Sequence, residues 1–167
     1  ASIAVGVGLW IRVMLLFSGI MIATTPLVAE ANGARTPEKI ATIARQSLWV
    51  AFILGSIAGL ILQSMPLLLP LMGVPANLLP KASLFLHAIG FGMPAVTMYA
   101  ALRGYSEALG HPRPVTVISL AALVLLVPLN FVFMYGFGPI PALGSAGCGF
   151  ATAILQWIMF FTLATYI

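Results

Sequence analysis

Long uncharged stretches alternate along this chain with short segments that hold its few charged residues. The uncharged stretches contain 17, 35, 21 and 54 residues, at positions 13–29, 46–80, 82–102 and 114–167. A helix needs roughly 20 mostly apolar residues to cross the hydrocarbon layer of a bilayer. Each stretch is therefore long enough for one or two membrane-spanning helices.

Clusters of proline and glycine divide the longer stretches into separate segments. The pattern predicts five spanning helices, at about 9–28, 47–68, 83–102, 115–135 and 148–167. Asn32-Gly33 predicts the end of one helix, and Thr36-Pro37-Glu38 predicts the beginning of the next. The segments lack the period-two alternation of membrane β-strands. The predicted fold is therefore all-α, a polytopic transmembrane helical bundle, with residues 1–167 as one unit.

Composition agrees with a membrane protein, because only 6% of the residues are charged. Soluble domains average about 25%. The seven basic residues lie between apolar stretches and do not cluster with aromatic residues, so we expect no nucleic-acid partner. A single cysteine, Cys148, excludes an internal disulfide. The chain begins without methionine and inside apolar sequence, which predicts a fragment of a longer protein.

The basic residues also predict an orientation. The predicted loops 29–46 and 103–114 contain five of them, whereas the loop between the second and third spans contains Lys81 alone. By the positive-inside rule, loops 29–46 and 103–114 are predicted to be cytoplasmic. The first span would then run from outside to inside, which requires an odd number of preceding helices if the true N-terminus is cytoplasmic.

Three ionisable residues each have a structural and a functional interpretation. Arg12 lies 18 residues before Glu30, or about 27 Å along a helix. It could reach the outer interface beside Trp10, or pair with an acid on a missing helix. Glu30 could be a solvated loop residue paired with Arg35, or a functional acid. His87 could be an interfacial residue or part of a proton relay.

Two further motifs concern the packing of the helices. Gly55 and Gly59 form a G-x-x-x-G pattern, which allows two helices to approach closely. Pro128 lies inside the fourth span and predicts a bend there, because proline cannot donate a backbone hydrogen bond. Asn130, two residues later, could join two helices by a hydrogen bond or line a polar cavity for a substrate or cation.

No enzymatic chemistry is expected, since the sequence has no H-E-x-x-H, Walker or dinucleotide-binding motif. We expect no cofactor and no metal site. Without an ATP site, transport would need an ion gradient or another subunit. The chain contains no aspartate, and its three glutamates lie in predicted loops or at their edges. A main coupling acid would therefore lie outside this chain.

Four stretches resemble a known transporter family. They are Pro26–Ala34, Leu102–Leu109 with Pro112-Arg113-Pro114, Val127–Gly136 and Pro141–Ala153. In this order they resemble the ends and junctions of helices 2 to 6 in the multidrug and toxic compound extrusion (MATE) family, in its NorM-like branch. The resemblance covers most of the chain.

The resemblance implies a protein of twelve helices in two bundles, of which this chain would form most of the N-terminal lobe. It implies a multi-pass protein of the bacterial inner membrane that exports drugs and organic cations in antiport against protons or sodium. An acid on the missing helix 1 would carry the ion. Asn130 and Thr152 match supporting polar positions, whereas Leu126 stands where relatives often carry asparagine and Glu30 where they often carry glutamine.

We expect a wide apolar cavity lined by methionine and aromatic side chains, which suit varied substrates. Transport would alternate access between the two bundles, with Pro128 as a bending point. Two alternatives stay open: a flippase of lipid-linked saccharides from the same superfamily, and a non-transporting membrane subunit. The expected partners are the bilayer, small-molecule drugs and the remainder of the transporter.

Overall fold

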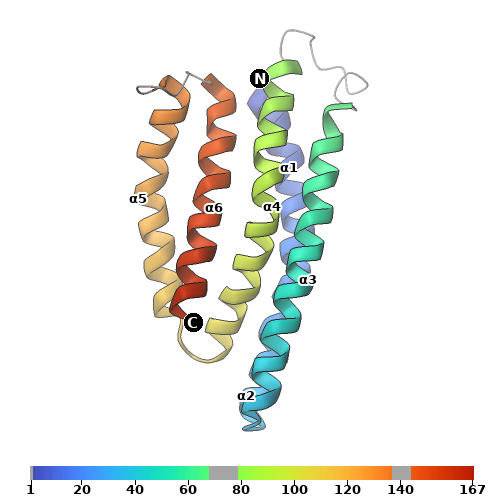
Figure 1. Ribbon diagram of the computed structural model, residues 1–167, viewed down its shortest axis with the longest axis vertical. Coiled ribbons are helices and arrows are strands. Elements are labelled where there is room, and N and C mark those ends of the chain that lie inside the picture. Colours follow the sequence, from blue (N-terminus) through green and yellow to red (C-terminus); the bar gives the residue numbers. More distant parts are fainter. Residues whose placement is uncertain (1, 68–78, 137–143) are drawn as a thin grey trace.

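The computed structural model describes residues 2–67, 79–136 and 144–167 as a helical bundle without strands. The helices run alternately up and down, except that α1 and α2 follow one another in the same direction (Figure 1). They are α1 (Ser2–Ile22), α2 (Thr24–Gly33), α3 (Pro37–Ser64), α4 (Leu79–Ala108), α5 (Arg113–Tyr135) and α6 (Gly147–Tyr166), with short 3₁₀ turns at Met65–Leu67 and Gly144–Ala146. The all-α bundle predicted from the sequence is confirmed.

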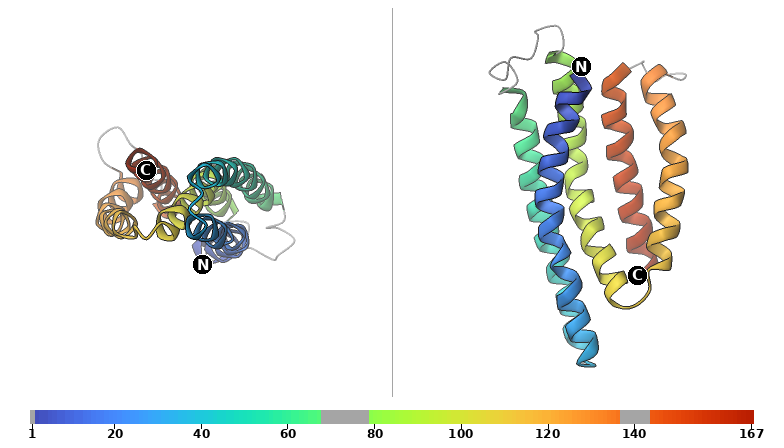
Figure 2. Two further views of the ribbon diagram at one scale, coloured as in Figure 1. Left: turned by 90° about the horizontal axis from the view of Figure 1, so that it is seen from below. Right: turned by 180° about the vertical axis from the view of Figure 1, so that it is seen from behind.

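The first predicted span, 9–28, lies within one segment of membrane-spanning length, Val7–Gly33, but the helix in it is interrupted at Ala23, between α1 and α2. Pro26 explains the break. It has no N–H to donate to the carbonyl of Ile22 four residues earlier, so the regular ladder cannot continue. The two helices still follow one another almost in line, as the right view of Figure 2 shows.

α4 is the centre of the bundle and contacts α1, α2, α3 and α6. Figure 2 shows α4 between α1 to α3 on one side and α5 and α6 on the other. Its buried positions include many small residues, among them Gly90, Gly92, Ala95 and Ala101. Small residues allow backbones to approach closely, which is how helices associate where hydrophobic burial gives no driving force.

The seam between α3 and α4 confirms the close approach predicted at the G-x-x-x-G pattern. A Cβ atom added to Gly59 would lie 2.6 Å from the carbonyl oxygen of Gly90. About two turns away, the buried hydroxyl of Thr97 donates to the carbonyl oxygen of Ala51 at 2.7 Å. A hydrogen bond between helices at this depth adds to the packing of the two glycines.

The connections 29–46 and 103–114 are mostly helical, which corrects the loops predicted there. α2 ends at Gly33 and α3 begins at Pro37, as the sequence motifs predicted, and α4 continues to Ala108. α2 and α4 end with the same pair of backbone hydrogen bonds. The residue with a left-handed backbone conformation is Arg35 after α2 and Gly110 after α4. Both turns lie at the lower end of the molecule in Figure 1, with the C-terminus.

α3 begins well before the second predicted span and α4 extends beyond both ends of the third, because their polar ends carry charged side chains that reach water. α5 and α6 agree with the fourth and fifth predicted spans to within two residues at each end. Residue 68, the last of the second predicted span, lies outside the described residues. By length and composition, five helical segments of the described chain can cross a membrane, with α1 and α2 counted as one.

Candidate functional site

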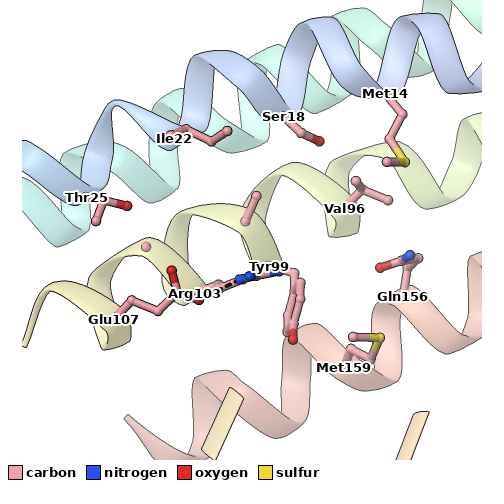
Figure 3. Close-up of a pocket in the computed structure, with 12 residues that line it drawn as sticks. Met14, Ser18, Ile22, Thr25, Val96, Tyr99, Arg103, Glu107, Gln156 and Met159 are labelled. Carbon is pink, nitrogen blue, oxygen red and sulfur yellow. Dashed lines mark hydrogen bonds and ion pairs between the residues drawn. The ribbon is translucent and has the colours of Figure 1, made fainter. Parts of the chain in front are cut away.

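A half-open cavity of about 470 Å³ lies between α1, α2, α4 and α6. Figure 3 shows its lining side chains, which come from helices far apart in the sequence. The apolar part of the lining includes Met14 and Met159. The polar and charged part consists of Ser18, Thr25, Tyr99, Arg103, Glu107 and Gln156. The cavity therefore combines the methionine and aromatic lining expected from the sequence with a polar side, to which Asn130 does not contribute.

An ion pair borders the cavity near the last turn of α4. Arg103 Nε donates to Glu107 Oε1 at 2.7 Å, and both side chains are partly exposed. The arginine precedes the glutamate by four residues, which is the weaker order for helix stability. The two side chains thus pair within one helix.

Cys148 lies in the first turn of α6, and the predicted residues Asn130 and Thr152 both contact it. Cys148 Sγ donates to Asn130 Oδ1 at 3.2 Å, which joins α5 to α6. Thr152 Oγ1 donates to the carbonyl oxygen of Cys148 at 2.8 Å. The three side chains are half-buried. The structure thus brings Asn130 and Thr152 together through Cys148, and the hydrogen bond between helices expected of Asn130 is present.

A polar stripe on α6 connects this cluster with the cavity. Cys148, Thr152 and Gln156 follow one another at four-residue spacing, so they lie on one face of α6. They cover about 12 Å of the helix axis. Gln156 lines the cavity, although Asn130 and Thr152 do not. Our sequence reasoning missed Gln156, and its spacing from Thr152 is the signal that could have identified it.

Tyr99 is a second cavity residue that the sequence did not single out. It is buried in α4, and its hydroxyl lies 3.2 Å from Ser119 Oγ on α5. A buried tyrosine usually finds a partner for its hydroxyl group. This contact fixes one wall of the cavity against α5, and no sequence pattern links the two residues.

The other predicted residues lie apart from the cavity lining. Pro128 is exposed in the middle of α5, which continues through it to Tyr135. His87 is exposed near the start of α4, and its Nδ1 lies 2.7 Å from the carbonyl oxygen of Ser83, to which it donates. Arg12 is exposed in α1. Their roles in transport stay predictions.

Glu30 is an exposed residue of helix α2, which corrects its prediction as a loop residue. Its backbone carbonyl accepts the N–H of Ala34 as part of the helix end. Within the described part of the chain, Glu30 and Arg35 form no ion pair. The expected pairing of these two side chains is therefore wrong.

Comparison with known proteins gives consistent matches. A family model named MatE matches residues 1–132. The chain is 80% identical over 167 residues to a "Probable multidrug resistance protein NorM" of Acinetobacter baylyi, covering 100% of this chain and 37% of that protein. It is 38% identical over 162 residues to "Multidrug resistance protein PmpM" of Pseudomonas aeruginosa, covering 96% of this chain and 34% of that protein. The chain thus spans about a third of the length of these relatives.

The fold is also that of a solved transporter. A structure described as an outward-facing conformation of a multidrug resistance MATE family transporter matches with a TM-score of 0.88 at 20% identity, over 99% of this chain and 36% of that one. At this identity the match supports the fold alone. The match to the MatE model covers most of the chain and confirms the resemblance found in the sequence motifs. The chain belongs to the MatE family.

Proposed function

We propose that this chain forms most of one lobe of a multidrug efflux transporter, which antiports drugs and organic cations against protons or sodium. The observation that carries the proposal is the cavity between α1, α2, α4 and α6. Polar side chains are costly inside a membrane unless they line a protein interior or an aqueous path. A cavity with polar and charged lining at spanning helices is typical of a transport pathway.

The lining of the cavity suits chemically varied substrates. Met14 and Met159 are flexible and polarizable, and Tyr99 offers an aromatic face. A flat organic cation could stack on Tyr99, and it would meet the Arg103–Glu107 pair, in which the two charges balance each other. No cofactor is needed for this process beyond the coupling ion.

In this proposal the polar stripe on α6 provides a hydrated route between the Asn130 cluster and the cavity. Asn130 and Thr152 would form the supporting network, and Gln156 would link it to the cavity. The main coupling acid would lie outside this chain, in the remainder of the transporter. His87, Arg12 and Glu30 would have secondary roles, and Pro128 would be a bending point of α5.

The proposed orientation follows from the charges at the two ends of the bundle. The turns at 34–36 and 109–112 lie at the same end (Figure 1). That end carries five basic residues in or near its turns, whereas Lys81 is in the first turn of α4 at the other end. We place the lower end of Figure 1 in the cytoplasm of a bacterial inner membrane.

Drug accumulation in efflux-deficient bacteria would test the proposal. The full-length transporter should lower the accumulation of a fluorescent organic cation, and Asn130→Ala and Gln156→Leu should each restore most of it. Gln63→Leu is the matched control, because Gln63 is an exposed glutamine of α3 outside the cavity lining. Normal accumulation with a well-expressed parent protein would contradict efflux. Full efflux by Gln156→Leu would contradict the assigned route.

A further inference from the structure

A second hollow, of about 510 Å³, lies between the beginning of α5 and the end of α6. Its lining is polar at one end and apolar along the rest. Arg113 is in the first turn of α5 and Tyr166 is the last residue of α6, so both lie at the end of the bundle that holds the C-terminus. Val117 and Ile118 line the hollow four and five residues further along α5, which is roughly 6–7.5 Å deeper.

The polar end of the hollow is suited to a negatively charged group. Arg113 is exposed and forms no ion pair with any residue in the described ranges. The positive end of the α5 dipole adds to its charge. Thr165 already donates its hydroxyl to carbonyl oxygens within α6, so Arg113 and Tyr166 are the side-chain donors that an incoming group would meet.

The apolar part of the hollow is suited to a hydrocarbon chain. The side chain of Val117 is 65% exposed, and Thr162 bonds its hydroxyl to the carbonyl oxygen of Ile158, which leaves its methyl group for the hollow. A basic group at the interface followed by apolar walls inside the bilayer is complementary to an anionic phospholipid. An organic cation would instead be repelled by Arg113.

We propose that this hollow binds one anionic phospholipid, with its phosphate on Arg113 and Tyr166 and an acyl chain along Val117 and Ile118. Basic pockets between membrane helices recognise lipid head groups in this way. The hollow beside Pro128 and Phe131 on the same helix is a useful contrast. It is lined by Val127, Pro128, Phe131 and Val132, without a basic side chain, so it should accept acyl chains without preference for a head group.

Lipid binding to the full-length transporter can be measured by native mass spectrometry in mild detergent, independently of transport. The protein should bind phosphatidylglycerol about fivefold more tightly than phosphatidylcholine with the same chains. Arg113→Gln should remove this preference, and excess inorganic phosphate should not displace the lipid. Arg45→Gln is the control, since Arg45 is an exposed basic residue of α3 away from the hollow.

Two results would overturn the proposal. The first is a preference for phosphatidylglycerol that survives Arg113→Gln or is lost equally in Arg45→Gln. The second is an adduct between a photo-crosslinking amino acid at position 117 and another segment of the transporter, which would show that protein covers the hollow. The proposal expects an adduct with lipid instead.

Discussion

α4 and α5 are both long enough and apolar enough to cross a membrane, yet they have opposite environments. In the most apolar 18-residue window of each helix, 67% of α4 is buried inside the bundle but only 6% of α5. α5 has the higher mean hydropathy of the two. In this bundle, hydrophobicity therefore does not decide which helix is central.

The difference lies in the size and polarity of the side chains. α4 buries Gly90, Gly92 and Thr97, whereas α5 exposes Leu123 and Val124. Lipid tails are as apolar as leucine, so burying a leucine against another helix gains little over leaving it in lipid. Small residues allow close packing only against another helix, and a hydroxyl group can form an interhelical hydrogen bond only there. These two requirements place α4 at the centre.

The largest effect should come from filling the α3–α4 seam. Gly59→Leu places a side chain against the Gly90 backbone, which has no room to move, and should destabilise the full-length protein by about 3 kcal/mol. Thermal unfolding in mild detergent measures this change. Gly19→Leu is the control, because a Cβ atom at Gly19 meets nothing within 4 Å. Equal melting temperatures for the two variants would contradict the packing argument.

Truncation of one large side chain in each helix compares the two environments directly. Met93 in α4 is 0% exposed, whereas Leu123 in α5 is 63% exposed. Met93→Ala leaves a cavity and should cost about 2 kcal/mol, whereas Leu123→Ala should cost less than about 0.5 kcal/mol. The same unfolding assay gives both values. A larger loss for Leu123→Ala would mean that another part of the transporter covers that face of α5.

A smaller effect should follow removal of the hydrogen bond between α3 and α4. Thr97→Val keeps the shape of the side chain but removes its donation to the Ala51 carbonyl, which should cost about 1 kcal/mol. Thr162→Val is the matched control, because the Thr162 hydroxyl bonds to Ile158 within its own helix. The interhelical bond contributes nothing to stability if both variants unfold at the same temperature.

The sequence predicted the local features of this fold well. Gly33 ends α2 and Pro37 begins α3, as the capping residues indicated. Gly55 and Gly59 lie at a close helix contact, as their spacing indicated. These features depend on neighbours within one or two turns, so the residue types alone carry the signal.

The site was predicted only in part, because it depends on contacts between distant segments. Asn130 was identified from its position beside Pro128, and Thr152 by resemblance, but their common partner Cys148 was not identified. The cavity unites Ser18 of α1 with Gln156 of α6, which are well over a hundred residues apart in the chain. Nothing in the local pattern of either helix shows that α4 brings them together.

The smallest effect should come from the exposed end of α4, where the central helix resembles α5. The side chains of Arg103 and Glu107 are 55% and 36% exposed, so solvent screens their ion pair. A double-mutant cycle with Arg103→Gln and Glu107→Gln should give a coupling energy below about 0.5 kcal/mol in the unfolding assay. A coupling above about 1.5 kcal/mol would mean that the pair is shielded from water in the intact transporter. α4 and α5 thus differ in their local environment, and this environment also changes along α4 itself, from its buried middle to its exposed end.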